Sequence, residues 1–104
     1  RAFVEVKGVT LEEDGVALFP DAPTQRGVKH LEGLIRCKEE GYEAMAVFVV
    51  QMENVLSFSP NDMTHPAFGQ ALRKAREQGV RLLALSCRTE PDKLEIADPV
   101  PIVL

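Results

Sequence analysis

Two ionisable residues with a chemically useful spacing lie near the start of the chain, where Glu5 and Lys7 stand in the segment FVEVKGV. In a β-strand, residues two apart point to the same face, so Glu5 and Lys7 share a face with Phe3 and Val9. Hydrolysis of a phosphodiester requires an activated water and neutralisation of the charge on the phosphorus oxygens. A Mg²⁺ ion held by carboxylates neutralises the charge on these oxygens and contributes to activating the water. A lysine beside the ion orients or deprotonates the water. The spacing therefore indicates one candidate chemistry, with Glu5 and Lys7 as catalytic residues and Glu5 also as a metal ligand.

The Glu-x-Lys triplet also has a simpler interpretation, as an exposed ion pair on a strand. Roughly one acid-x-Lys triplet per 100 residues is expected by chance at ordinary composition, so on the triplet alone the ion pair is favoured. A metal site also needs a second acid. Asp21 is the candidate for this second metal ligand, although the usual layout of such a motif places that acid upstream of Arg1.

The elements that would position these residues are predicted from hydrophobic periodicity and turn signals. Asp14-Gly15 is a strong hairpin signal, Thr24 is a plausible helix N-cap, and Pro66 suits the first turn of a helix. In chain order, the prediction is strands over 3–11 and 16–19, a helix over 24–40, a strand over 44–50, a loop over 53–64, a helix over 66–78, a strand over 80–87, a short strand over 93–97 and an extended segment over 99–102.

This order of elements predicts an α/β fold with a mixed, mostly parallel sheet and flanking helices. Each helix joins strands too far apart in sequence for a hairpin, so the main strands should run parallel, and the hairpin over 3–19 should make the sheet mixed. The unbroken apolar run Ala44–Val50 is typical of a strand covered on both faces. The 104 residues suffice for one domain, 1–104, and because Arg1 is followed at once by a strand we expect a fragment of a longer protein.

Composition excludes several classes of protein. The chain is 45% hydrophobic and 27% charged, and it has no signal peptide and no apolar run long enough to span a bilayer, so we expect no membrane association. Cys37 and Cys87 are isolated, which fits a reducing, cytoplasmic location. The net charge of −4 argues against nucleic-acid binding by bulk positive charge, so such binding would require a local basic patch.

The first predicted helix carries a basic stripe. At 100° per residue, one face holds the apolar residues Val28, Leu31, Leu34, Ile35 and Tyr42, and the roughly opposite face holds Arg26, Lys29, His30, Gly33 and Cys37. Cations in the first two turns of a helix are unfavourable, because this is the positive end of the helix dipole. One interpretation is that Arg26 and Lys29 are placed there to bind an anion such as phosphate. The alternative is an ordinary solvated polar face, which the stripe by itself favours.

Longer motifs than the triplet carry a family resemblance that covers essentially the whole chain. The segments FVEVKGVTL, GVALFPDAPTQRGVKHL and AVFVVQ resemble the sugar fermentation stimulation protein A (SfsA) family. The resemblance implies a restriction-endonuclease-like core of the PD-(D/E)XK type, preceded in the family by an OB-like domain that we expect to lie outside these 104 residues. It also implies DNA as the partner and a link to sugar metabolism.

The resemblance assigns roles to particular residues. Glu5 and Lys7 match the acid and the lysine of the nuclease-like motif, and Gln51 matches a polar residue that ends the central strand. The residues that match the family's helix signature are Asp21, Thr24, Arg26, Gly27, Lys29 and His30, of which Thr24, Arg26, Lys29 and His30 are the candidate nucleic-acid contacts. The chain departs from the family pattern at Gly8, Gly33 and His65.

Three functions remain open at this point. DNA binding is the favoured function, and a Mg²⁺-dependent nuclease that uses Glu5, Lys7 and an upstream Asp is the alternative. Whichever of these two functions holds, the 104-residue chain is expected to be inactive as a nuclease, because one carboxylate and a carbonyl hold Mg²⁺ poorly. The third interpretation is a structural α/β domain in which Glu5 and Lys7 form a satisfied ion pair.

Overall fold

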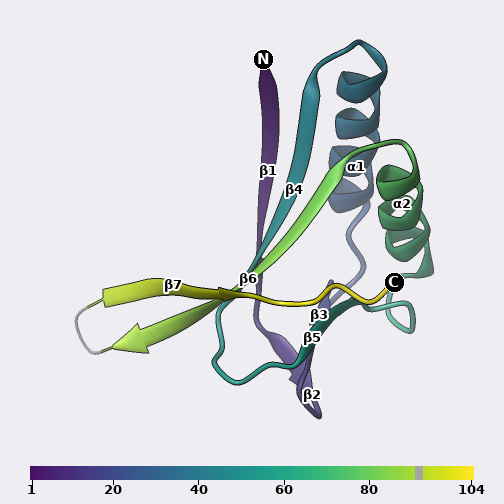
Figure 1. Cartoon of the computed structure of the whole chain (residues 1–104). Coiled ribbons are helices and arrows are strands. Elements are labelled where there is room, and N and C mark those ends of the chain that lie inside the picture. Colours follow the sequence, from purple (N-terminus) through teal and green to yellow (C-terminus); the bar gives the residue numbers. More distant parts are fainter. Residues whose placement is uncertain (91–92) are drawn as a thin grey trace.

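The computed structural model describes the backbone of residues 1–90 and 93–104 and the side chains of residues 1–87 and 98–104. Its elements in chain order are β1 (Ala2–Val9), β2 (Leu11–Glu13), β3 (Val16–Phe19), α1 (Gln25–Glu39), β4 (Glu43–Val50), β5 (Ser57–Pro60), α2 (Pro66–Glu77), β6 (Arg81–Glu90) and β7 (Lys93–Pro99) (Figure 1). Both predicted helices are present. The prediction of a loop over 53–64 is wrong at β5, and the first predicted strand is divided at Thr10.

The central element is a four-stranded sheet with the strand order β1-β4-β6-β7. β1 is parallel to β4, and β4 is parallel to β6, whereas β7 is antiparallel to β6. The predicted α/β class with a mixed, mostly parallel sheet and flanking helices is confirmed. The antiparallel member is β7, and not the hairpin to which the sequence analysis assigned the mixed character.

The helices α1 and α2 lie on the same face of this sheet (Figure 1). The strands that the helices connect follow one another in a single direction across the sheet, from β1 to β4 to β6. Right-handed crossovers that advance in one direction place successive helices on one face. Within the described residues, neither helix has the length and apolar character needed to cross a membrane.

The hydrophobic core lies between the helices and the two sheets of the molecule. Phe48 of β4 stacks on Phe58 of β5, with ring centroids 4.5 Å apart, and meets Phe68 of α2 edge-on at 6.5 Å. All three rings are at most 1% exposed. Burial of such rings contributes several kilocalories per mole, so this aromatic contact fixes β5 and α2 against the central strand.

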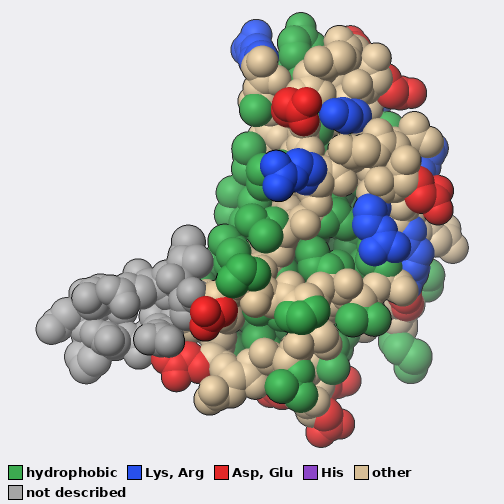
Figure 2. All heavy atoms as spheres, in the orientation of Figure 1, with side chains coloured by type: hydrophobic (Ala, Val, Ile, Leu, Met, Phe, Trp, Pro, Cys, Tyr) green, Lys and Arg blue, Asp and Glu red, His purple; other side chains and the backbone are tan. Residues whose placement is uncertain are grey.

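The opposite face of the four-stranded sheet is more open than the sequence analysis predicted. Val4 and Val6 of β1 are 53% and 60% exposed, and Leu83 of β6 is 37% exposed. Hydrophobic side chains follow the strands on this side of the molecule (Figure 2). Along β4 itself the residues on this side, Met45, Val47 and Val49, are half-buried. The prediction that both faces of 44–50 are covered therefore holds only in part within the described residues, because both crossover helices occupy the other face.

The predicted hairpin belongs to a separate three-stranded sheet with the order β2-β3-β5. Asp14 and Gly15 connect β2 to β3 with φ values of 50° and 85°, as a two-residue turn with both φ values positive requires. β3 is parallel to β5. This small sheet leads the chain from the end of β1 to the start of α1.

The start of α1 is set by Thr24, as the sequence analysis predicted. The Thr24 Oγ1 accepts a hydrogen bond from the Gly27 backbone N–H at 3.0 Å. Gly27 is itself buried, and a Cβ there would lie 2.9 Å from Thr24 Cγ2 and 3.1 Å from the ring of Phe68, so α1 packs closely against α2 at a residue without a side chain. Gly41, with φ of 93°, follows the end of the helix.

We expect Thr24→Ala to lower the free energy of unfolding by about 1 kcal/mol, because the Gly27 N–H loses its acceptor. Urea unfolding followed by circular dichroism measures the loss. Thr24→Ser is the matched control and should retain most of the stability, since it keeps the hydroxyl. Equal losses in the two variants would contradict the capping role.

Candidate functional site

β1 presents alternate side chains to α1 and to the open face of the sheet. Val9 is fully buried on the helix side, and Phe3, Glu5 and Lys7 are half-buried on that same side. Val4 lies between them on the exposed side. The prediction that Glu5 and Lys7 share a face with Phe3 and Val9 is confirmed, and this face is the one that α1 covers.

His30 of α1 joins the two strand residues in what we call the Glu5–Lys7–His30 cluster. The His30 Nδ1 lies 2.6 Å from Lys7 Nζ and 3.0 Å from Glu5 Oε1, and the Lys7 Nζ lies 3.7 Å from the same carboxylate oxygen. The side chains of Lys7, His30 and Glu5 are 19%, 28% and 35% exposed. The cluster is therefore a partly shielded set of one acid, one cation and one imidazole.

The hydrogen bonds of this cluster compete with one another. A neutral imidazole nitrogen either donates or accepts, so the His30 Nδ1 accepts from Lys7 Nζ or donates to Glu5 Oε1, but not both. When Nδ1 accepts the hydrogen bond from Lys7, the Glu5 carboxylate can accept a hydrogen bond from another group. When Nδ1 donates to Glu5, the Lys7 ammonium can donate to another group. The arrangement can therefore offer an ammonium to an anionic oxygen while His30 satisfies the carboxylate.

The position of His30 was not predicted from the helical pattern. The helical pattern predicted His30 on the face opposite the apolar stripe. His30 nevertheless lies three residues after Gly27 and four before Leu34, both of which are buried. Residues three and four apart share a side of a helix. If Gly27 is included among the buried residues of the helix, the pattern predicts that His30 lies at the boundary of the buried face.

Arg26 and Lys29 are exposed on the same helix as His30. Arg26 is one turn before His30, and Lys29 lines a shallow depression of ≈ 270 Å³ together with Glu5 and His30. Among the side chains that the structure describes, neither Arg26 nor Lys29 forms an ion pair. The hydroxyl of Thr24, the fourth candidate nucleic-acid contact, is occupied by the helix cap.

The basic residues of α2 differ in their pairing. Arg73 donates two hydrogen bonds to Asp62, of 2.7 and 3.2 Å. These hydrogen bonds from Arg73 lower the pKa of Asp62 below its usual value, against the opposing effect of burial. Lys74 and Arg76 on this helix are exposed. The charge of Arg73 is therefore compensated within the chain, whereas Arg26 and Lys29 have no such partner among the described side chains.

The described residues do not complete a site for a divalent cation. Glu5 supplies one carboxylate, and the Lys7 ammonium lies 3.7 Å from it. Asp21, the predicted second ligand, is exposed in the loop before α1 and does not line the depression that Glu5 and His30 line. The part of the chain with described side chains contains no group of three or more His, Cys, Asp or Glu residues that could hold a metal ion. Mg²⁺ and Ca²⁺ require more oxygen ligands than this.

Two further residues named by the resemblance lie outside the cluster. Gln51 follows β4 on the open side of the sheet, where its Nε2 would lie 3.0 Å from a Cβ placed on Gly8. His65 precedes α2, and its Nδ1 accepts a hydrogen bond from the Thr24 backbone N–H at 3.0 Å. His65 therefore connects the start of α2 to the start of α1, a structural role that the sequence did not reveal.

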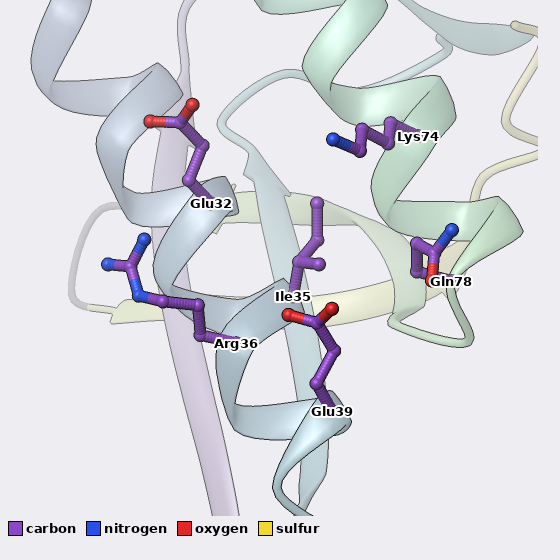
Figure 3. Close-up of a pocket in the computed structure, with 6 residues that line it drawn as sticks. All are labelled: Glu32, Ile35, Arg36, Glu39, Lys74 and Gln78. Carbon is purple, nitrogen blue, oxygen red and sulfur yellow. The ribbon is translucent and has the colours of Figure 1, made fainter.

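A second groove, of ≈ 400 Å³, runs between α1 and α2. Figure 3 shows its lining residues, which are Glu32, Ile35, Arg36 and Glu39 of α1 and Lys74 and Gln78 of α2. Ile35 points toward the space between the helices, and charges of both signs surround it. Because it shares no lining residue with the Glu5–Lys7–His30 cluster and has no net excess of cations, this groove is a weaker candidate for binding a polyanion.

Comparison with known proteins decides the family. The family model described as "Sugar fermentation stimulation protein RE domain" matches residues 1–93. The chain belongs to the SfsA family. The predicted resemblance to this family is thus confirmed, and the match to its RE domain agrees with a restriction-endonuclease-like fold.

Curated SfsA relatives match the chain along its whole length. It is 57% identical over 104 residues to a sugar fermentation stimulation protein homolog of Desulfitobacterium hafniense strain Y51, and 51% identical over 104 residues to the homolog of Clostridium beijerinckii. In both cases the match covers 100% of this chain and 46% of the relative. The chain therefore spans less than half the length of these relatives.

A solved structure supports the fold. The structure of Pyrococcus furiosus SfsA in complex with Ca²⁺ superposes with a TM-score of 0.93 at 32% sequence identity. The superposition covers 99% of this chain and 45% of that chain. The arrangement of β1, α1 and β4 described above is thus shared with an SfsA protein from another organism.

We expect Glu5→Ala to lower the free energy of unfolding by about 1 kcal/mol, because it leaves the half-buried Lys7 against His30 without a carboxylate. Glu43→Ala is the matched control, since Glu43 forms a 3.5 Å ion pair with Lys38 but has a side chain that is 70% exposed. That control should change stability by less than about 0.5 kcal/mol. Urea unfolding of both variants provides the comparison, and indistinguishable losses would show that the cluster is no more than a surface ion pair.

Proposed function

We propose that this chain is a DNA-binding module that contacts phosphates without strong sequence preference, through the first turns of α1. The observation that carries the proposal is the placement of two exposed cations without ion-pair partners among the described side chains, Arg26 and Lys29, beside the Glu5–Lys7–His30 cluster. The link to sugar metabolism rests on the family's name and is part of the same proposal.

Electrostatics supports this location on an otherwise acidic chain. The net charge is −4, so the surface as a whole repels a polyanion. Arg26 and Lys29 lie near the positive end of the helix dipole, where the first turn of α1 contains no acidic residue. Phosphates favour such a place, because unpaired backbone N–H groups and cationic side chains attract the same charge.

We expect the double variant Arg26→Ala, Lys29→Ala to weaken DNA binding and to reduce the slope of log affinity against log salt by about 2, one unit for each lost phosphate contact. Fluorescence anisotropy with a labelled oligonucleotide, at several salt concentrations, measures both quantities.

The matched control for this experiment is Lys74→Ala, Arg76→Ala, which removes the same charge from exposed positions on α2. The salt slope of this control should stay close to that of the unchanged chain, apart from the small effect of net charge. DNA binding that both double variants weaken equally would contradict a site on α1.

The second candidate function is a metal-dependent nuclease. Two observations favour it: the Glu5–Lys7 spacing on one face of β1, and the Ca²⁺ complex of the Pyrococcus furiosus relative. Glu5 would supply one metal ligand, Asp21 or an acid outside this chain would supply another, and Lys7 would lie beside the metal. Mg²⁺ would supply charge neutralisation at the phosphate. The described residues provide one carboxylate at the cluster, that of Glu5.

We expect the 104-residue chain to leave both single-stranded and duplex DNA intact in the presence of Mg²⁺ or Mn²⁺, because Glu5 alone holds such ions poorly. Gel electrophoresis of labelled DNA after long incubation is the measurement. Metal-dependent cleavage that disappears in Glu5→Ala would show that the chain's own residues suffice.

A further inference from the structure

The depression beside the Glu5–Lys7–His30 cluster has two chemically different ends. Its polar end is lined by Glu5, Lys29 and His30, and its apolar end by Phe3, Leu34 and Cys37. It lies between β1, which is an edge strand of the four-stranded sheet, and α1. Its volume of ≈ 270 Å³ is slightly below the usual range for drug-sized ligands, so it suits a single small ring system.

Gly33 keeps this depression open. Gly33 lies in the middle of α1 and lines the depression, and a Cβ there would meet only the Arg36 Nη2, at 3.8 Å. The helix therefore has room for a side chain at this position, although glycine costs about 1 kcal/mol relative to alanine in a helix interior. The absence of a side chain at residue 33 gives access to the apolar end.

The Phe3 ring lines the apolar end, one cation lies beside this ring, and a second cation lines the polar end. Phe3 is half-buried, its ring meets Tyr42 edge-on at 5.4 Å, and the Arg1 guanidinium lies 5.4 Å from the Phe3 ring centroid. Lys29 lines the other end of the same depression. Proteins that bind single strands combine an aromatic contact for a base with cations that follow the phosphates.

We propose that this depression takes one unpaired nucleobase, in contact with Phe3, while Lys29 binds the adjoining phosphate. The inference deepens the proposed DNA binding by naming its substrate class, a single-stranded nucleic acid. A base in a duplex is paired and stacked, and turning it outward costs a few kilocalories per mole. A single strand offers the base without that cost.

The test measures how far binding depends on the bases. Fluorescence anisotropy compares labelled oligo(dT) with an oligonucleotide of the same length that carries abasic sites, so the two probes have equal phosphate charge. We expect the unchanged chain to bind oligo(dT) at least about fivefold more tightly than the abasic probe, as one base–aromatic contact predicts. Gly33→Leu, which fills the depression, should remove this difference and leave binding of the abasic probe unchanged.

Two further variants separate loss of the depression from loss of the fold. Gly33→Ala should retain the difference between the probes, because a single methyl group leaves most of the depression open. Phe3→Leu should reduce that difference while circular dichroism shows an unchanged fold. Val6→Leu, on the open face of β1, is the control for a change on the same strand and should have no effect.

The outcomes distinguish the two proposals. Equal affinity of the unchanged chain for both probes, or a base preference that persists in Gly33→Leu, overturns the base site but leaves phosphate binding by α1 standing. Failure of the chain to bind oligo(dT), the abasic probe and a duplex alike overturns both proposals.

Discussion

The complete burial of Val9 is the constraint on which the candidate site depends. Val9 is 0% exposed at the end of β1, so the two-residue period of the strand directs Phe3, Glu5 and Lys7 to the helix-covered side. A shift of one residue would expose Val9 and bring Val4 and Val6 against α1 instead. The parallel pairing of β1 with β4 is continuous from Ala2 to Val9, and it fixes which residues of β1 face α1. The polar cluster is thus held in place by hydrophobic packing.

The order of strands explains both the site and the open face. Two crossovers that advance in one direction place α1 and α2 on the same face of the sheet, with α1 over Glu5 and Lys7, and they leave Val4 and Val6 exposed on the other side. The same helix that closes the core also carries Arg26, Lys29 and His30 to the edge of β1. One helix therefore supplies the imidazole of the cluster and the exposed cations near it.

Much of this arrangement was predictable from the sequence, because strong local signals specified it. The Thr24 cap, the glycine after α1, the Asp14-Gly15 turn and the alternation in β1 all describe interactions within a few residues. β5 was not predicted, because its four residues, Ser57–Pro60, are stabilised by the contact of Phe58 with Phe48, a residue outside the strand's own segment. The roles of Glu5, Asp21 and the basic residues as ligands stay predictions, since ligand contacts depend on partners that the chain does not contain.

The central claim is that the leading turns of α1 and the adjoining end of β1 form a surface for nucleic-acid phosphates. Mapping of amide and side-chain NMR shifts on titration with a short single-stranded oligonucleotide tests this claim most directly. We predict the largest shifts at Lys7, Arg26, Lys29 and His30. Shifts concentrated instead at Lys74 and Arg76 on α2, with the α1 residues unchanged, would contradict it.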